Sequence, residues 1–304
     1  MARQPLCDVS RSLHPGRPGA LCTTGGSARR RSRPLIIRLF AVLLTSVIAT
    51  VALAAPGLTA GALNEFKVEL PTDLRKVAGR GKLSPVTHAL VTIAVPANFD
   101  PSRDWPVLVV SATTDFGYNS SRQLLRDYAE TALKAGWIAM AADPADRADF
   151  RQDTVPLRLA LNLAALSVLD QQWPRTGRAP IAVGGFSGGS KVSGWVAAAF
   201  VSEGRTVIGA YLAGINQESL VSAGKLFDVL NPGFKRIPVF LQSGLKDNIS
   251  TPAEHRDVAA ELKRAGFKNV RVEYFPGEHD VYPGPLRAAL DWFRELAALP
   301  LTAK

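Results

Sequence analysis

The sequence predicts an α/β protein with a mostly parallel central sheet and helices on both faces. Short apolar runs alternate with helical segments every 25 to 35 residues, which is typical of strand–helix–strand units. Some runs, such as 107–111 and 137–142, are apolar throughout, as in strands that are buried on both faces. The intervals between runs are long enough for the crossover connections that parallel strands require.

Each expected element has its own sequence signal. The strand at 89–95 alternates, is rich in β-branched residues and stops before Pro96. The helix at 121–134 has apolar residues at helical spacing, and the helix at 156–169 is apolar on nearly all sides, which predicts a buried helix. The other expected strands are 107–111, 137–142, 181–184, 207–212, 237–241 and 270–275. The other expected helices are 191–201, 217–230, 252–265 and 285–296. No element is assigned to 57–81, and 76–82 is expected to be a flexible basic loop.

The N-terminal region predicts an export signal. A basic cluster at 29–33 precedes an uncharged run at 39–55, and the run ends in small residues typical of a signal-peptide cleavage site. A retained membrane anchor is the alternative, since the 17 residues of this run are at the lower limit for crossing a bilayer. We therefore divide the chain into a leader with a signal peptide (1–55) and a single α/β domain (56–304). The protein is expected to be secreted or periplasmic.

The net charge of +10 arises mostly in this leader. Residues 1–38 hold eight arginines and one acidic residue, which leaves 28 of the 36 basic and 25 of the 26 acidic residues for the rest. We therefore expect no nucleic-acid partner, and a membrane partner only if the leader is uncleaved. Cys7 and Cys22 both precede the apolar run, so a cleaved chain would have no disulfide and no thiolate ligand. No metal-ligand cluster, P-loop or dinucleotide glycine pattern stands out, and we expect no cofactor and no metal.

The sequence Gly185-Phe186-Ser187-Gly188-Gly189 follows an expected strand and precedes an expected helix. A serine on a sharp turn between a strand and a helix exposes its hydroxyl above the sheet, and the positions around it must be small. Gly185 and Gly189 supply those small positions, and Gly188 places a backbone N–H beside the serine. The alternative is an ordinary Gly/Ser loop, because the five-residue pattern alone often occurs by chance.

A nucleophilic serine needs a base, and in parallel sheets function gathers at the carboxyl ends of the strands. Of the four histidines, His14 lies in the leader and His88 precedes a strand, at what we take to be the opposite end. His255 lies in a charged helical stretch and is interpreted as a solvated residue. His279 follows the last expected strand in a glycine-containing loop, so it is the candidate base for Ser187.

The matching acid is expected in the loop after the preceding strand. Asp247 lies a few residues past the strand at 237–241. Its alternative role is that of a turn residue or the N-cap of the next helix. Glu278 and Asp280 are adjacent to His279 in sequence and would point elsewhere.

Ser187, Asp247 and His279 occur in the order nucleophile, acid, histidine, with spacings of 60 and 32 residues. This is the order in α/β-hydrolases. On these residues, 89–297 resembles secreted serine hydrolases of the α/β-hydrolase superfamily and is similar to dienelactone-hydrolase-like and polyhydroxybutyrate-depolymerase-like esterases. The resemblance implies that Ser187 is the nucleophile, that His279 is the general base and then acid, and that Asp247 orients the imidazole. Dienelactone hydrolases use a cysteine nucleophile, so that activity is not implied here.

The oxyanion hole departs from the common pattern. One donor is expected to be the N–H of Gly188, and the second normally comes from the loop after the third strand. Here that loop offers the N–H of Thr113 or Thr114, or the hydroxyl of Tyr118, in place of the His-Gly of many relatives. The segment 213–236 is too short for a large lid, which predicts an open, shallow site.

The function that these residues favour is hydrolysis of carboxylic esters through an acyl-enzyme, on small-molecule or polymeric substrates. Two alternatives remain open. A serine peptidase of the prolyl-oligopeptidase type shares the elbow and the residue order, although 304 residues leave no room for its usual propeller domain. A catalytically inactive binding protein with the same fold is supported by the loop without glycine.

Overall fold

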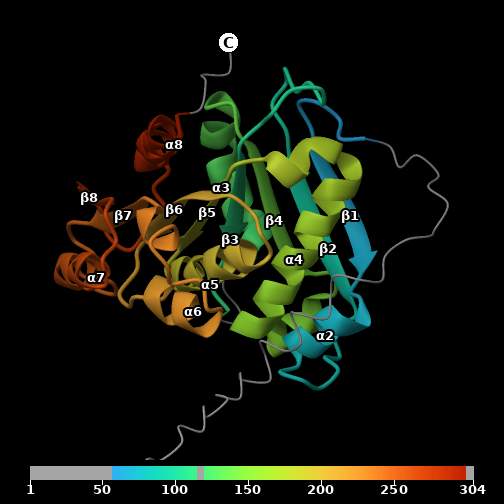
Figure 1. The fold of residues 1–304 in the computed structure, drawn as a ribbon, viewed down its shortest axis with the longest axis horizontal. Coiled ribbons are helices and arrows are strands. Elements are labelled where there is room, and N and C mark those ends of the chain that lie inside the picture. Colours follow the sequence, from blue (N-terminus) through green and yellow to red (C-terminus); the bar gives the residue numbers. More distant parts are fainter. Residues whose placement is uncertain (1–56, 115–119, 299–304) are drawn as a thin grey trace, which may run out of the picture. The chain divides into compact units, whose positions relative to one another are not determined.

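The computed structural model describes residues 57–114 and 120–298, and all of them lie in one structural unit. The expected leader and signal peptide therefore lie outside the described residues. An eight-stranded sheet with the order β1-β2-β4-β3-β5-β6-β7-β8 forms the centre of this unit (Figure 1). Its strands are β1 (Leu63–Glu69), β2 (His88–Ala94), β3 (Val107–Ser111), β4 (Ile138–Pro144), β5 (Ile181–Phe186), β6 (Val207–Ala213), β7 (Val239–Gly244) and β8 (Val270–Phe275).

The sheet is mostly parallel, as predicted. Only β2 runs against its neighbours: it pairs antiparallel with both β1 and β4. The strands from β4 to β8 pair in parallel along the sheet order. In register, Val107 of β3 faces Ile138 of β4 on one side and Ile181 of β5 on the other. The carboxyl ends of β3, β5, β6, β7 and β8 consequently meet at one edge of the sheet, where the candidate site lies.

Helices cover both faces of the sheet, which confirms the predicted layers (Figure 1). The helices are α2 (Thr72–Ala78), α3 (Ser121–Lys134), α4 (Val155–Gln172), α5 (Gly188–Ser202), α6 (Leu220–Leu226), α7 (Pro252–Arg264) and α8 (Gly284–Leu296). Short 3-10 helices occupy Arg147–Gln152, Pro174–Arg178 and Phe234–Arg236. Helices α3 and α8 pack on one face, and α2, α4, α5, α6 and α7 contribute to the core on the other.

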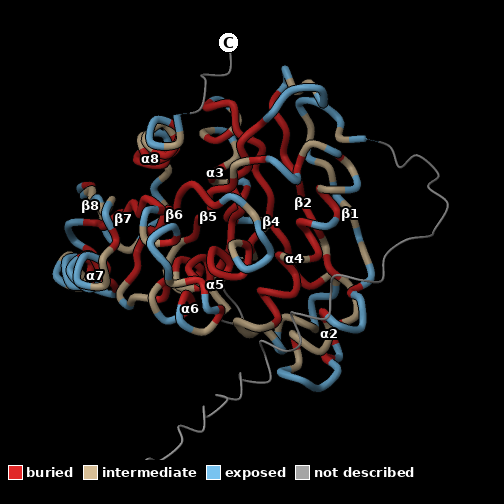
Figure 2. The backbone as a smooth tube through the Cα atoms, viewed as in Figure 1, coloured by how far each residue is buried: buried red, intermediate tan, exposed pale blue. Residues whose placement is uncertain are grey.

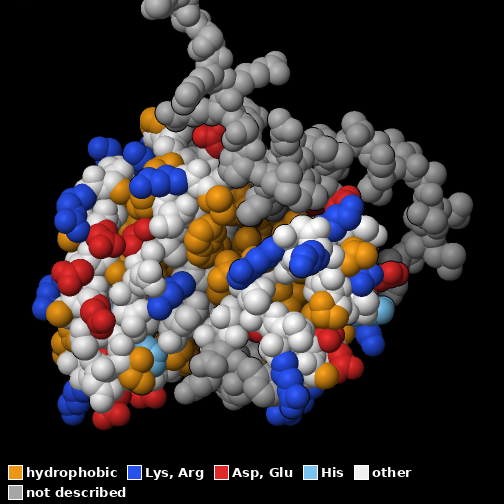
Figure 3. All heavy atoms as spheres, turned by 90° about the horizontal axis from the view of Figure 1, so that it is seen from below, with side chains coloured by type: hydrophobic (Ala, Val, Ile, Leu, Met, Phe, Trp, Pro, Cys, Tyr) orange, Lys and Arg blue, Asp and Glu red, His pale blue; other side chains and the backbone are white. Residues whose placement is uncertain are grey.

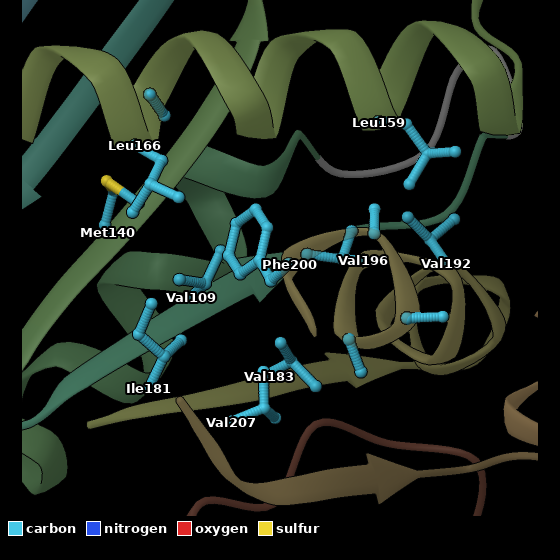
Figure 4. Close-up of a cluster of buried hydrophobic side chains, with 14 of the residues drawn as sticks. Val109, Met140, Leu159, Leu166, Ile181, Val183, Val192, Val196, Phe200 and Val207 are labelled. Carbon is cyan, nitrogen blue, oxygen red and sulfur yellow. The ribbon is translucent and has the colours of Figure 1, made fainter. Parts of the chain in front are cut away.

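The alternation of side chains along each strand divides the core between these two faces. Val107 and Val109 of β3 belong to the cluster with α4 and α5, whereas Leu108 and Val110 belong to the cluster with α3 and α8. Strands β3, β4 and β6 are buried along their whole length (Figure 2). In the larger cluster, Val109 of β3 and Val183 of β5 project from the sheet on the side where Phe200 of α5 packs (Figure 4). Continuous burial on both faces explains why these strands are apolar throughout.

The structure differs from the sequence expectation before residue 82. The region 57–81, to which no element was assigned, contains strand β1 and helix α2. Four of the seven β1 residues are exposed, because β1 is an edge strand, and this weakens its apolar signal. The expected flexible loop at 76–82 begins inside α2 and turns tightly, with the N–H of Lys82 donating to the carbonyl of Gly79 at 3.2 Å.

The segment after β6 is not a large lid, as predicted. The helix expected over 217–230 is the seven-residue α6, whose buried Leu220 and Ala223 belong to the α5 side of the core. Within the described residues, no helix is both long and apolar enough to cross a membrane.

Candidate active site

Ser187 occupies a strained turn between β5 and α5. Its backbone angles are φ 56° and ψ −124°, a conformation that L-residues rarely adopt. The turn is held to the neighbouring strand β6, because the N–H of Ser187 donates to the carbonyl of Ala213 at 2.8 Å. Strand β5 continues to Phe186 and α5 starts at Gly188, so the turn is sharper than the expected boundaries of 184 and 191 imply.

The glycines around Ser187 are required by close backbone contacts. A Cβ on Gly185 would overlap the carbonyl of Gly189, and a Cβ on Gly189 would overlap the carbonyl oxygen of Ser111 and lie 2.9 Å from Ala112 Cα. Real Cβ atoms essentially never approach other atoms this closely. The predicted tight packing of strand and helix behind the serine is therefore confirmed.

Asp247 and His279 are hydrogen-bonded to each other, as the sequence order predicts. The distance between His279 Nδ1 and Asp247 Oδ2 is 2.7 Å, and the Asp247 carboxylate is almost fully buried. Asp247 Oδ1 accepts hydrogen bonds from the N–H groups of Ile249 and Ser250, at 2.8 and 2.7 Å. The carboxylate is therefore held from both sides. It binds Nδ1 of the imidazole, so Nε2 is the ring nitrogen that this contact leaves free.

The loops that carry this pair approach each other because β7 ends in glycine. A Cβ on Gly244 would overlap the carbonyl of Glu278. The N–H of Lys246 donates to the carbonyl of Gly277 at 2.8 Å, which joins the two loops directly. Glu278 and Asp280 are exposed, in agreement with the expectation that they point elsewhere.

The ring of His279 lies beside the turn that carries Ser187. It packs on the ring of Phe186, with a centroid distance of 4.7 Å and an interplanar angle of 41°. A Cβ on Gly214 would lie 3.0 Å from His279 Cε1, so glycine at this position gives the imidazole its space. Among the described residues, the Ser187 hydroxyl has no hydrogen-bond partner. Catalytic hydrogen bonds are often long before substrate binds and tighten only in the complex.

Thr113 lies against the N-terminus of α5. A Cβ on Gly188 would overlap Thr113 Oγ1 and lie 3.4 Å from Thr113 Cα. The first and second expected donor positions are therefore adjacent. Thr114 follows in the same half-buried stretch, and Tyr118 lies outside the described residues.

The interpretation of His255 as a solvated residue is wrong. His255 is fully buried on α7, and its Nε2 accepts a hydrogen bond from the N–H of Ile215 at 3.1 Å. Its Nδ1 is 3.1 Å from the carbonyl of Thr251, so it acts as the donor of a neutral imidazole. Burial lowers the pKa of His255 below its ordinary value of 6.5, while the nearby Asp247 opposes this shift. His255 ties α7 to the residue that follows Gly214, next to His279.

The placement of His88 at the opposite end of the sheet is also wrong. Because β2 is antiparallel to β4, its first residue lies at the carboxyl edge, and the carbonyl of His88 accepts from the N–H of Ala145 just past β4. Strands β4 and β3 separate β2 from β5. Three strand spacings are about 14 Å, so His88 is still too far from Ser187 to act as its base.

Three residues that surround the candidate triad were not predicted: Phe186, Gly214 and His255. A signal for His255 was present, since His255, Val258, Ala259 and Leu262 recur at the spacing of one buried helix face. The other two positions depend on contacts between segments that are distant in sequence.

The topology and the strand-to-helix turn define the class: the chain has an α/β-hydrolase fold.

No family model matches the sequence, and neither does any curated protein. Several solved structures similar to this chain are esterases. A thermostable esterase from Pseudomonas putida ECU1011 matches with a TM-score of 0.51 and 15% identity, over 80% of this chain and 84% of that one. An esterase from Pyrobaculum calidifontis matches with a TM-score of 0.52 and 13% identity, over 79% and 86%. A cold-adapted esterase from an Arctic intertidal metagenomic library matches with a TM-score of 0.50 and 18% identity, over 76% and 92%.

Proposed function

We propose that this protein is an exported serine hydrolase that cleaves carboxylic esters. The observation that carries the proposal is the 2.7 Å contact between Asp247 and His279, packed beside the strained turn of Ser187. A strained serine next to an imidazole that is oriented by a buried carboxylate is the arrangement that activates a hydroxyl for acyl transfer.

In the proposed mechanism, Ser187 Oγ attacks the acyl carbon of the ester while its proton moves to His279 Nε2. The tetrahedral intermediate collapses, the C–O bond to the alcohol breaks, and the imidazolium gives its proton to the departing alcohol. Water then attacks the acyl-enzyme, again with His279 as base, and releases the acid and free Ser187. Asp247 stabilises the imidazolium that forms in both halves of the reaction.

The oxyanion of each intermediate needs donors at the N-terminus of α5. We assign the N–H of Gly188 as the first donor. The second is assigned to the backbone of Thr113 or Thr114, a choice supported by the contact between Thr113 and Gly188. Removing one such donor typically lowers kcat by about 10²–10³-fold.

The substrate is proposed to carry an apolar group. Leu245 and Ile249, on either side of Asp247, are 58% and 60% exposed. Hydrophobic side chains also gather on the face of the molecule that is seen from below, with Lys and Arg side chains among them (Figure 3). The short segment after β6 supports access by bulky or polymeric esters. The similar structures described as esterases support the reaction class.

Labelling with a fluorophosphonate probe tests the nucleophile. The wild-type protein should be modified at Ser187, and Ser187→Ala should not react. Ser202→Ala is the matched control, because Ser202 lies on the same helix but at its far end, where its hydroxyl donates to the carbonyl of Ala199. A folded wild-type protein that does not react would favour the inactive binding protein. Cleavage of peptide but not ester substrates would favour the peptidase.

Hydrolysis of p-nitrophenyl esters of graded length, beside release of acid from a polyester film, tests the substrate class. We expect activity on both. A crystal structure in which 213–236 closes over a buried pocket would contradict the open site. N-terminal sequencing of the exported protein tests the leader, with a mature chain expected to begin near residue 56.

A further inference from the structure

A buried charge network lies beside the candidate oxyanion loop. Its centre is Arg158 in the first turns of α4, whose side chain is 1% exposed. The guanidinium binds the Asp153 carboxylate through two nitrogens, with a distance of 2.9 Å between Nε and Oδ1. It also binds Asp143 at the end of β4, with 2.6 Å between Nη1 and Oδ1. A planar guanidinium that is held by two carboxylates has one fixed orientation.

The Asp143 carboxylate fixes the start of α3 as well. It accepts the N–H groups of Ser121 and Arg122 at 2.9 and 2.8 Å. These are N–H groups of the first helical turn, which have no acceptor within the helix. The position of Ser121 is therefore set by the same network that holds Arg158.

Arg158 reaches the loop after β3 at two points. Its Nη2 donates to the carbonyl of Thr113 at 3.4 Å. Its Nη1 donates to Ser121 Oγ at 2.7 Å, and that hydroxyl oxygen accepts the N–H of Ala112 at 3.1 Å. The network thus holds the Ser111–Ala112 peptide by its N–H and the Thr113–Thr114 peptide by its carbonyl. These two peptides flank the Ala112–Thr113 peptide.

Because a peptide group is planar, a hydrogen bond to its carbonyl or its N–H also fixes the direction of the other group. The C=O and N–H of a trans peptide point in opposite directions. With the Thr113 carbonyl on Arg158, the N–H of Thr114 points away from the guanidinium. With the Ala112 N–H on Ser121, the carbonyl of Ser111 points the other way, to where a Cβ on Gly189 would overlap it. The N–H of Thr114 therefore has a direction set by Arg158, and the backbone before Thr113 is held by Ser121.

We infer that Arg158 is a positioning residue for the second oxyanion donor, an inference that rests on the proposed function. Arg158 does not touch the substrate. It holds the loop in the orientation in which a backbone N–H beside Gly188 meets the developing oxyanion. This replaces the conformational adaptation that glycine supplies in a His-Gly loop. Loss of Arg158 should therefore weaken transition-state binding more than ester binding.

Arg158→Met tests this inference, with Arg294→Met as the matched control. Arg294 is also a buried arginine that donates to two backbone carbonyls, those of Ala135 and Gly136, at 3.0 and 3.1 Å. It lies on α8 and packs on the opposite face of the sheet. The readouts are kcat and KM for p-nitrophenyl butyrate per active site, and the inhibition constant of phenylboronic acid, which forms a tetrahedral adduct with a nucleophilic serine.

For Arg158→Met we expect kcat to fall about 10- to 100-fold, which is a smaller decrease than removal of a whole oxyanion donor causes. KM should stay within about threefold, and boronic acid binding should weaken in parallel with kcat. Arg294→Met should keep kcat within about threefold. If Arg158→Met does not fold, Ser121→Ala removes the hydroxyl that links Arg158 Nη1 to the N–H of Ala112 and should show the same pattern with a smaller loss.

Two failures can be told apart. A wild-type protein that neither hydrolyses esters nor reacts with fluorophosphonate would overturn the proposed function and this inference with it. An active wild-type protein whose Arg158→Met variant, or Ser121→Ala variant, loses no more kcat than Arg294→Met would overturn the inference alone. A change in KM alone would do the same.

Discussion

The buried imidazole of His255 gives a prediction that the structure quantifies. In His255→Leu, the N–H of Ile215 loses its acceptor in a position that excludes water. The carbonyl of Thr251 is less affected, because it still accepts the backbone N–H of residue 255 at 3.1 Å. One buried unsatisfied donor costs about 1–3 kcal/mol. For a domain of this size each kcal/mol lowers Tm by about 2–4 °C, so a decrease of about 2–12 °C is expected.

His255→Gln is the matched variant, because its side-chain oxygen can accept from Ile215 near the place of Nε2. We expect it to lose less than half as much stability as His255→Leu. Thermal and urea unfolding at pH 8, where the wild-type imidazole is neutral, measure both. If His255→Leu were as stable as His255→Gln, the hydrogen bond to Ile215 would not be what holds α7 to the loop after β6.

A comparison of the wild-type protein with His255→Gln gives a second test, in which the sign of the pH dependence of stability is defined. The pKa of His255 is lowered in the folded state by burial, so the unfolded chain takes up its proton first as the pH falls. Stability from the neutral imidazole is complete above about pH 6.5 and is lost progressively below it, by at most about 1.4 kcal/mol per pH unit. His255→Gln lacks this group and should lose less stability between pH 6.5 and 5. Parallel curves for the two proteins would contradict the assignment.

The triad and the turn give two further predictions. Asp247→Asn keeps an acceptor for Ile249 and Ser250 but favours the wrong tautomer of His279, so kcat for p-nitrophenyl butyrate should fall by up to about 10⁴-fold with little change in Tm; a kcat within tenfold of wild type would refute the role of Asp247. Gly189→Ala places a Cβ against the carbonyl of Ser111 and should lower the free energy of unfolding by about 1–3 kcal/mol or more. Gly177→Ala, with no atom within 4 Å of the new Cβ, should change it by less than about 0.5 kcal/mol, and equal effects in urea unfolding would contradict the steric argument.

Features that depend on a local sequence pattern, or on the order of the strands, could be predicted from the sequence. The glycines around Ser187 indicate a tight turn because the steric requirement lies within five residues. The positions of Asp247 and His279 follow from the rule that parallel strands end at one edge, and the structure joins these two residues by a hydrogen bond.

Features that depend on the direction of a strand, or on contacts between distant segments, were missed. His88 was placed at the opposite end because nothing in its own stretch shows that β2 runs antiparallel. His255 was interpreted as solvated because its charged neighbours obscure the buried face of α7. The network of Arg158 joins residues up to 45 positions apart, and no local pattern marks such contacts.

The backbone angles of Ser187 set its hydroxyl against the stability of the turn. A non-glycine residue in such a conformation costs about 1–3 kcal/mol, and the fold must offset this elsewhere. Glycine would relax the turn, so Ser187→Gly should be more stable than Ser187→Ala, although both lack the hydroxyl. The conformation that presents the Ser187 hydroxyl therefore lowers the stability of the fold, and contacts elsewhere, such as the hydrogen bond from the N–H of Ser187 to Ala213, must hold the turn.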